Sequence, residues 1–427
     1  MIKSEKLRIV LLILIAGFLG YYIGVSKISF AWDNYQPHVE VSSKEPPASL
    51  QAGDASRIWE VLEKIEATYY DKKAITSEKV INGAIQGMVS SLDDPYTVYL
   101  PPAQNDDFKQ GLAGKFEGIG AELSLKDNAV VVVAPIDGSP AKKAGITPGD
   151  IIIKVNNESI SGKALNEVVE KIRGPKGTEV TLNVLQKDAK EPKDIKLVRD
   201  EITVKSLTSW TKKIKDVEGI DKKAEGIANN PEDKVIYIRL SQFGDSTNAE
   251  WMTLANTVDR QMNEDKTIKG IVFDLRNNPG GYLNDAVYIS SEFVPTGAAV
   301  MQEDKNQKRT SFPVTGKGML TDVPVIVLIN KGSASASEIV SGALRDHDRA
   351  KLVGETSFGK GTIQQAEDLG GGAGLHVTIA KWLTPDGNWV GNGKDGQGLK
   401  PDIEVAVDKE DPSHDVQLEK AIAELLK

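Results

Sequence analysis

The chain has 427 residues, enough for two or three domains, and its 40% hydrophobic and 26% charged residues are typical of globular proteins. A net charge of −9 without a basic patch argues against nucleic acid as a partner. Cysteine is absent, which excludes a disulfide framework and thiolate chemistry and fits an extracytoplasmic bacterial protein.

Residues 1–31 have the pattern of a membrane-directed segment. Seventeen uncharged residues, Ile9 to Val25, follow three basic ones, Lys3, Lys6 and Arg8. This length is the lower limit for a membrane-spanning helix, and the basic flank holds the N-terminal end in the cytoplasm. We therefore expect a single-pass anchor with the remainder on the extracytoplasmic side. A signal peptide cleaved near Ser29 to Ala31 is the alternative, giving a secreted or periplasmic protein.

Residues 32–54 carry several prolines and serines without periodicity and predict a tether. Residues 55–114 begin with two runs of apolar residues at helical spacing, Ile58 to Tyr69 and Val80 to Leu92, and Pro95 ends the second run. Two helices are too little for a core of their own. This helical segment is expected to cap the rest of the chain or to pair with another subunit as a homodimer.

Residues 115–187 change pattern. The loop Gly118-Ile119-Gly120-Ala121 precedes a strand from Glu122 to Leu125, and further short strands and a helix over 164–172 follow. This order resembles a PDZ domain. The resemblance implies that the amides of Gly118, Ile119, Gly120 and Ala121 bind the terminal carboxylate of a peptide, which adds as a strand beside Glu122 to Leu125. A PDZ-like fold with an unused groove is the alternative.

Residues 188–408 alternate strands and helices, which predicts an α/β layer structure. The expected strands include 235–240, 270–274, 325–329 and 375–382, and the expected helices include 249–262 and 283–293. Residues 409–427 contain a short amphipathic helix over 415–426.

The most informative motif is Gly332-Ser333-Ala334-Ser335-Ala336-Ser337-Glu338. It stands between the apolar run 325–329 and a helical pattern from Glu338 to Arg345. Such a strand–turn–helix exposes a serine hydroxyl beside the amides of a helix N-terminus. Serine needs a base, and Lys360, 25 residues after Ser335 and flanked by glycines, is the candidate. The alternative is that Ser335 is only a turn residue and Lys360 a solvated loop lysine.

Together these residues closely resemble the carboxyl-terminal processing peptidases, or tail-specific proteases, which are Ser–Lys enzymes with a built-in PDZ domain. The resemblance covers roughly residues 55–408. It includes three further motifs: Asp94-Pro95-Tyr96-Thr97-Val98-Tyr99-Leu100, Asp274-Leu275-Arg276-Asn277-Asn278-Pro279-Gly280-Gly281 and Leu399-Lys400-Pro401-Asp402-Ile403-Glu404-Val405. It implies an α/β (α+β) multidomain fold, with a crotonase-like protease core that an inserted PDZ domain splits in sequence.

The resemblance also assigns roles. Register against the family motif selects Ser335 as nucleophile over Ser333 and Ser337, with Lys360 as general base and Gln364 as the side chain that orients the lysine. A lysine base requires a lowered pKa, which burial supplies. For the oxyanion we expect the amides of Ala336 and Gly281, or Gly280 in place of Gly281.

Other readings stay open. A Ser-His-Asp site would need His347 or His376, and Asp346 is expected to be structural rather than a supporting acid. Neither a metal nor a cofactor is expected.

The predicted function is a serine endopeptidase that recognises proteins with free apolar C-termini. The alternatives are a catalytically inactive PDZ scaffold and a crotonase-fold acyl-CoA enzyme. A regulatory partner is possible, and Arg173, at the end of the groove helix, is a candidate reporter of gating by the PDZ-like part.

Overall fold

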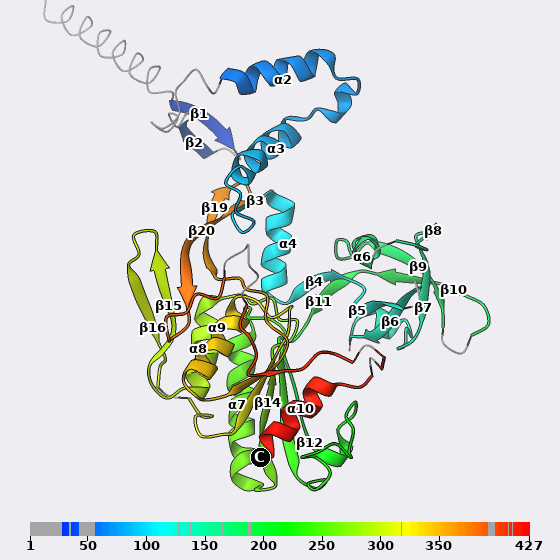
Figure 1. Cartoon of the computed structure of the whole chain (residues 1–427). Coiled ribbons are helices and arrows are strands. Elements are labelled where there is room, and N and C mark those ends of the chain that lie inside the picture. The colour runs from blue at the N-terminus through cyan, green and yellow to red at the C-terminus, as the bar shows by residue number, and fades with distance from the viewer. Residues whose placement is uncertain are drawn as a thin grey trace, which may run out of the picture. The chain divides into compact units, whose positions relative to one another are not determined.

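The computed structural model (Figure 1) describes residues 28–33, 36–41 and 56–427, apart from 127–128, 137, 164, 187–188, 317, 392–397, 409 and 412. The chain divides into two compact units, residues 1–84 and 85–427. The predicted anchor or signal peptide, Ile9 to Val25, lies outside the described residues. Within the described part of the chain, no helix combines the length and apolarity needed to cross a membrane.

The first unit holds an antiparallel strand pair, β1 (Ile28–Asp33) and β2 (Gln36–Val41). The sequence predicted the end of the anchor or signal segment over residues 28–31 and a tether from residue 32, yet Ile28, Phe30 and Trp32 alternate with other residues in the two-residue period of a strand. The remaining elements are α2 (Ser56–Thr68), the 3₁₀ turn η1 (Lys72–Ala74) and α3 (Ser77–Ser90), which continues into the second unit.

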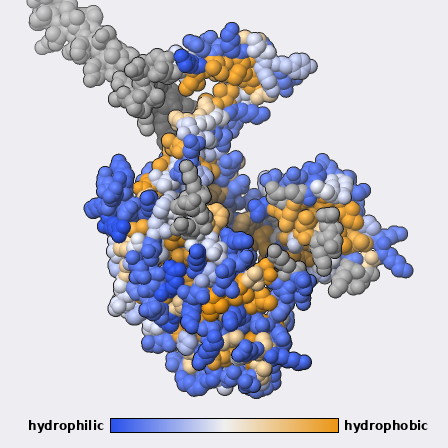
Figure 2. Space-filling view, viewed as in Figure 1, coloured by the Kyte–Doolittle hydropathy of each residue, from blue (hydrophilic) through white to orange (hydrophobic). Residues whose placement is uncertain are grey.

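Helix α2 has no buried residue. Large apolar side chains on it and just after it are exposed: Ile58, Trp59, Val61, Ile65, Tyr69 and Tyr70. Figure 2 shows hydrophobic surface on this segment. An amphipathic helix normally buries such a stripe. The expectation that this segment pairs with another subunit stays a prediction.

In the second unit, residues 121–198 form a PDZ-like body around a sheet with the spatial order β10-β9-β7-β6-β5. Its strands are β5 (Ala121–Lys126), β6 (Ala129–Pro135), β7 (Ile151–Val155), β9 (Glu179–Leu185) and β10 (Lys193–Val198), with the short β8 (Glu158–Ser159) beside β7. Helices α5 (Pro140–Lys143) and α6 (Leu165–Ile172) complete it. The sheet thus continues past the predicted boundary at residue 187, because β10 pairs with β9.

An antiparallel ribbon carries the chain into and out of this body. Strand β4 (Lys115–Gly118) leads in, β11 (Asp200–Thr203) leads out, and the two pair along their full length. The PDZ-like body is therefore an insertion, as the sequence resemblance implied.

The protease-like core is a three-layer α/β structure (Figure 1). Its six-stranded sheet runs, in spatial order, β12 (Leu207–Lys213), β13 (Lys234–Leu240), β14 (Ile268–Asp274), β17 (Val325–Ile329), β18 (Lys351–Gly354) and β21 (Ile403–Glu404). The strands from β13 to β21 pair in parallel, whereas β12 is antiparallel to β13 and leads to the turn η2 (Ile214–Asp216).

Helices cover both faces of this sheet. One face packs against α7 (Thr247–Glu264), α8 (Leu283–Phe293) and α9 (Ala336–Asp346), and the other against α10 (Val416–Leu425). On β14, Ile271 and Phe273 enter the first core and Val272 the second, as the alternation of strand side chains requires. The predicted mixed α/β multidomain fold is confirmed.

A second sheet closes one side of the core, with the order β16-β15-β20-β19 and β3 paired to β20. Its strands are β15 (Ala298–Asp304), β16 (Arg309–Pro313), β19 (Thr362–Gly370), β20 (Ala373–Leu383) and β3 (Val98–Leu100). Helix α4 (Pro102–Leu112) follows β3 and leads to β4. Pairing of Val98 with His376 brings the 94–100 motif to the strand hairpin that follows Lys360.

Candidate active site

Ser335 occupies a strained turn between β17 and α9. It is the N-cap of α9, with φ 55° and ψ −114°. A positive φ is uncommon for a residue with a side chain and costs on the order of 1–3 kcal/mol, which surrounding structure must supply. The strand–turn–helix expected from the sequence is present, although the helix begins at Ala336 rather than at Glu338.

The two neighbouring serines are committed elsewhere. The hydroxyl of Ser333 donates to the Leu275 carbonyl at 2.8 Å, and that of Ser337 donates to the Asn278 carbonyl at 2.9 Å. Both side chains are fully buried, whereas Ser335 is partly exposed and lines a cavity. Of the three serines of the motif, Ser335 is the one that lines the cavity.

Lys360 lines the same cavity, of about 490 Å³, although it comes from the loop before β19. The other walls are mostly apolar: Pro95, Tyr96, Val98, Phe108, Leu112, Leu283, Ile339, Ile363, Ala366 and Trp382. Burial lowers the pKa of Lys360 below the ordinary lysine value, against the negative charges of Glu338 and Asp94, which raise it. The direction of this shift favours the neutral amine that a base must be.

Glu338 joins the serine turn to the lysine loop. One of its carboxylate oxygens accepts from the amides of Ser335 (2.7 Å) and Lys360 (3.0 Å). The other accepts from the Ser357 hydroxyl (2.5 Å) and the Gly359 amide (2.6 Å). The side chain is fully buried, and burial raises its pKa while these four hydrogen bonds lower it. A single carboxylate therefore fixes the backbones of both predicted catalytic residues.

The glycine pair lies against the serine turn. A Cβ on Gly280 would stand 2.8 Å from the Ser335 Cβ and 2.9 Å from the Ala336 nitrogen. The Gly280 amide donates to Asn278 Oδ1 at 2.9 Å, so it is occupied. Gly281 forms a parallel bridge with Phe243, in which Phe243 bonds to the Gly280 carbonyl and the Tyr282 amide.

Because Phe243 bonds to the residues on either side of Gly281, the Gly281 amide itself points away from Phe243. Gly281 is thereby a better oxyanion candidate than Gly280. Ala336 is the first residue of α9, where an amide has no partner within the helix.

Gln364 lines the cavity four residues after Lys360. Its amide nitrogen donates to the hydroxyls of Thr362 (2.8 Å) and Thr378 (3.2 Å). These bonds fix the side chain and leave its carbonyl oxygen as the atom able to accept from the lysine. The predicted orienting role remains a prediction.

The alternative histidines differ in position. His347 lies at the C-terminal end of α9, where its Nε2 is 2.8 Å from the Ala298 carbonyl oxygen. Asp346 lies at the same end, with the Arg345 guanidinium and the Asp386 amide as partners. His376 does line the cavity, with its ring 4.6 Å from that of Phe108, and burial and the charge of Lys360 lower its pKa. It is thus a second basic side chain within the candidate site.

The PDZ-like body has its own groove, of about 380 Å³, between the edge strand β5 and helix α6. Gly118, Ile119, Gly120 and Ala121 line it, as predicted from the sequence. The carbonyls of Ile119 and Gly120 are engaged by the amides of Ala141 and Ile136. Gly120 has a φ of 71°, and a Cβ there would lie 2.4 Å from that of Ser139, so the turn requires glycine.

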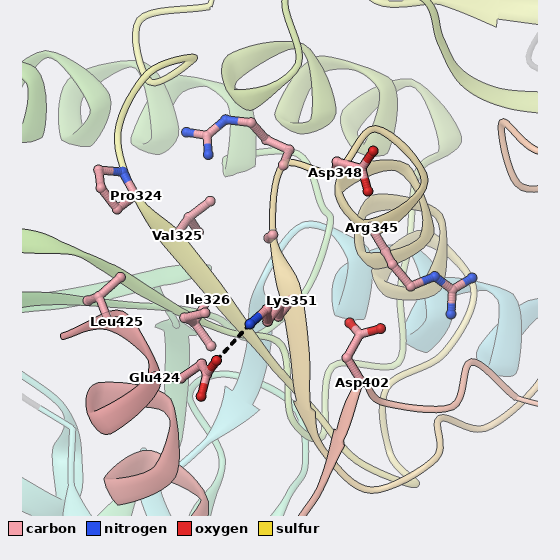
Figure 3. A pocket seen from close by; sticks show the side chains of 11 residues that line it. Pro324, Val325, Ile326, Arg345, Asp348, Lys351, Asp402, Glu424 and Leu425 are labelled. Carbon is pink, nitrogen blue, oxygen red and sulfur yellow. Dashed lines mark hydrogen bonds and ion pairs between the residues drawn. The ribbon is translucent and has the colours of Figure 1, made fainter. Parts of the chain in front are cut away.

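A further pocket, of about 500 Å³, lies at the opposite ends of the central strands (Figure 3). It is lined by Pro324 and Lys351, which stand at the starts of β17 and β18, and Lys351 pairs with Glu424 of α10. Ligands of parallel sheets bind outside the carboxyl ends of the strands, which is where Ser335 follows β17. This pocket is therefore not part of the candidate active site.

The chain is similar to known proteins in both sequence and fold. Models of three families match: Peptidase family S41 over residues 234–405, the PDZ domain over 131–186, and the activating protease CtpB N-terminal domain over 14–103. The carboxy-terminal processing protease CtpA of Bacillus subtilis is 37% identical over 360 residues, which are 84% of this chain and 70% of that protein. The chain belongs to the carboxy-terminal processing protease family.

Further known proteins are similar to the chain in sequence or fold. A CtpA-like serine protease of Staphylococcus aureus is 38% identical over 356 residues, 83% of this chain, and the chain spans 65% of that relative's length. The solved photosystem II D1 C-terminal processing protease covers 88% of the chain at 27% identity, with a TM-score of 0.50 and 98% of its own length matched. An S41 protease from Bacteroides fragilis shares the fold, with a TM-score of 0.55 at 16% identity over 90% of this chain and 98% of its own.

The sequence reasoning gave no role to several residues that surround Lys360. Glu338 stood within the quoted motif, and its spacing of three residues from Ser335 is the capping-box pattern, which predicts that the glutamate accepts a hydrogen bond from the N-cap amide. The capping-box pattern could therefore have identified Glu338 from the sequence. Tyr96, by contrast, reaches Lys360 from far along the chain, and no local pattern predicts such a contact.

Proposed function

We propose that this chain is a serine endopeptidase that recognises the C-terminal tails of proteins and hydrolyses peptide bonds through a Ser335–Lys360 dyad. The observation that carries the proposal is the Glu338 carboxylate, which binds the amides of both residues at the edge of one cavity. If Ser335 were only a turn residue and Lys360 only a solvated loop lysine, nothing would require both backbone amides to bind one buried carboxylate.

The proposed reaction has two stages. Neutral Lys360 takes the proton of the Ser335 hydroxyl while the oxygen attacks the scissile carbonyl. The amides of Ala336 and Gly281 then stabilise the oxyanion, and the lysine ammonium returns the proton to the leaving amine. Water hydrolyses the acyl-enzyme with Lys360 again as base. Gln364 would accept a hydrogen bond from Lys360 and hold its amine toward Ser335.

The PDZ-like groove would select the substrate. A peptide would extend the sheet at β5, its terminal carboxylate would meet the amides of the 118–121 loop, and its last side chain would lie against Val169 and Ile172 of α6. The walls are apolar, which suits an apolar C-terminal residue.

Arg173, directly after α6, stacks over the Phe116 ring of the ribbon at 4.9 Å. This contact supports the proposal that ligand binding is transmitted from α6 to the ribbon, and so gates the protease. The effect can be no larger than the ligand's differential affinity for the two states.

The N-terminal segment would hold the catalytic part at the extracytoplasmic face of a membrane, or be removed as a signal peptide. This proposal rests on the sequence pattern of residues 1–31. Pairing through the exposed apolar residues of α2 would make the protein a homodimer.

The test is cleavage of a peptide with a free apolar C-terminus by the full chain and four variants. Ser335→Ala, Lys360→Ala and Lys360→Arg should be inactive, the last because a guanidinium stays charged. His376→Asn should keep a substantial rate, since it alters the cavity wall but not the base. If His376→Asn is inactive and Lys360→Ala is active, histidine is the base.

The inactive PDZ scaffold makes the opposite prediction. In that case the wild-type chain binds C-terminal peptides and cleaves none of them. Cleavage that is lost in folded Ser335→Ala protein excludes the scaffold, and it excludes an acyl-CoA enzyme as well.

A further inference from the structure

The segment from Asp94 to Leu100 has no role in the proposed mechanism, yet it lies beside the candidate base. The Nζ atom of Lys360 is 5.1 Å from the centroid of the Tyr96 ring. Pro95 and Tyr96 line the same cavity as Ser335 and Lys360. A distance below about 6 Å places an amine against the face of an aromatic ring, so this ring forms a wall of the lysine's surroundings.

Hydrogen bonds fix the turn that carries the ring. The Asp94 carboxylate accepts from the Tyr96 amide at 3.0 Å and from the Thr97 hydroxyl at 2.6 Å. The Thr97 hydroxyl in turn accepts from the Thr378 amide on β20 at 3.1 Å. Directly after the turn, β3 pairs with β20. The position of Tyr96 is therefore determined by both its own turn and the neighbouring sheet.

We propose that Tyr96 is a positioning residue for Lys360, whose ring excludes water from the lysine amine and holds it toward Ser335. This inference rests on the proposed function, in which Lys360 is the base. An ammonium group gains more from water than a neutral amine does, so a wall that removes water favours the neutral form, and in this proposal that effect outweighs the attraction of the ring face for the charged form.

Negative charges near Lys360 act on its pKa in the direction opposite to burial. Glu338 on α9 and Asp94 on the turn are negative and raise the pKa of Lys360, whereas burial is the largest influence and lowers it. His376 on β20 is the other titratable group that faces the lysine, and its own pKa is lowered. The pKa of Tyr96 is raised by burial and by Glu338 and Asp94, so its ring remains a neutral phenol. Removing the Tyr96 ring would expose the Lys360 amine to water while the two carboxylates stay in place, so the pKa of Lys360 would rise.

The experiment compares three forms of the full chain, wild type, Tyr96→Phe and Tyr96→Ala, by kcat and KM for a short peptide across pH. Tyr96→Phe keeps the ring and should retain kcat within threefold and the same pH midpoint. Tyr96→Ala should lower kcat at pH 7 at least tenfold, leave KM within threefold, and move the midpoint to higher pH by about one unit, since a tenfold smaller neutral fraction corresponds to one unit. An unmoved midpoint, or a shift to lower pH, would overturn the inference.

A second measurement does not depend on activity. In a Ser335→Ala background, competitive acetylation of Lys360, quantified by mass spectrometry across pH, reports the protonation of the amine directly. It should show the same alkaline shift on adding Tyr96→Ala. Tyr96→Leu, which keeps an apolar side chain, replaces the alanine variant if that does not fold, and should shift the midpoint in the same direction.

A matched control separates positioning from stability. Tyr99 lies in the same segment but packs against Val89 and Ala373 in a small core. Tyr99→Leu should lower the melting temperature without moving the pH midpoint, and a shift equal to that of Tyr96→Ala would contradict the proposal. The proposed function fails separately: if Lys360→Ala remains active, the base is wrong, whereas an inactive Lys360→Ala with an unchanged Tyr96→Ala refutes this inference alone.

Discussion

Replacing Glu338 by glutamine tests whether one buried carboxylate holds the candidate dyad together. The substitution keeps the shape but exchanges one acceptor oxygen for an NH₂ group. If the NH₂ replaces the oxygen that serves Ser335 and Lys360, two backbone amides lose their acceptor. If it replaces the other oxygen, the Gly359 amide loses its acceptor, and the Ser357 hydroxyl, which already accepts from the Leu399 amide, must reorganise.

The second orientation is the less costly and sets the magnitude. One unsatisfied buried amide costs about 1–3 kcal/mol, and the two remaining bonds lose charge assistance worth about 0.5–1 kcal/mol each. Relief of the buried charge offsets part of this, because burial raises the pKa of Glu338. We expect a net loss of about 2 kcal/mol in the free energy of unfolding. We also expect a fall in kcat of about 100-fold, the usual effect of a displacement near 1 Å in a catalytic group.

Urea denaturation followed by the fluorescence of the core tryptophans, Trp251 and Trp382, measures the first quantity, and peptide cleavage measures the second. The matched control is Glu225→Gln at an exposed site, which should change stability by less than about 0.5 kcal/mol. The reasoning is refuted if Glu338→Gln is as stable as this control and cleaves within threefold of the wild-type rate.

Three further predictions follow from the geometry. Cleavage should increase as pH rises through the lowered pKa of Lys360, which lies below 10.5. Between that pKa and 10.5 the unfolded chain binds more protons than the folded chain, so the free energy of unfolding rises with pH. Lys360→Met should be inactive but more stable than wild type at pH 7 in urea melts. Gly280→Ala should lower kcat at least 100-fold, because its Cβ would press on Ser335 and Ala336, whereas Gly87→Ala on α3, with no atom within 4 Å, should leave kcat unchanged. Calorimetry should show that amidating a peptide's C-terminus weakens its binding at least tenfold. Gly120→Ala should weaken binding of the free-acid peptide by a similar factor. Equal affinities for the acid and the amide would show that the groove does not bind the carboxylate.

Local patterns predicted the elements well where one face of an element determines its sequence. The apolar run 325–329 predicted a buried strand, and it is β17, buried at every position. In the PDZ-like segment the sequence analysis names several short strands but none at β10, although Ile195 and Leu197 alternate there with exposed residues in the period of a strand. Helix α4 was also missed, since it has few apolar residues and one fully buried position, Asn105.

The candidate site was predictable only in part, because its parts meet across long stretches of chain. Ser335 and Lys360 were identified by motif and spacing, and they do line one cavity. The bond from the Thr378 amide to Thr97 joins residues 281 positions apart, and no periodicity encodes such a contact. The sequence therefore indicates which side chains are suited to the chemistry, but not which backbone supports them.

Ser335 and Lys360 are both held in place by polar groups that have no role in the proposed reaction. Glu338 binds the amides of Ser335 and Lys360, and the Asn278 carbonyl binds the Ala334 amide and the Ser337 hydroxyl on the other side of the serine. Burial makes these bonds costly to break, so they can maintain the unfavourable φ of Ser335. A lysine that must stay neutral cannot be held by a close ion pair of its own, because a nearby carboxylate would favour the charged form. The structure anchors Lys360 through its backbone amide and places the Tyr96 ring 5.1 Å from its amine, which is the arrangement that the proposed base requires.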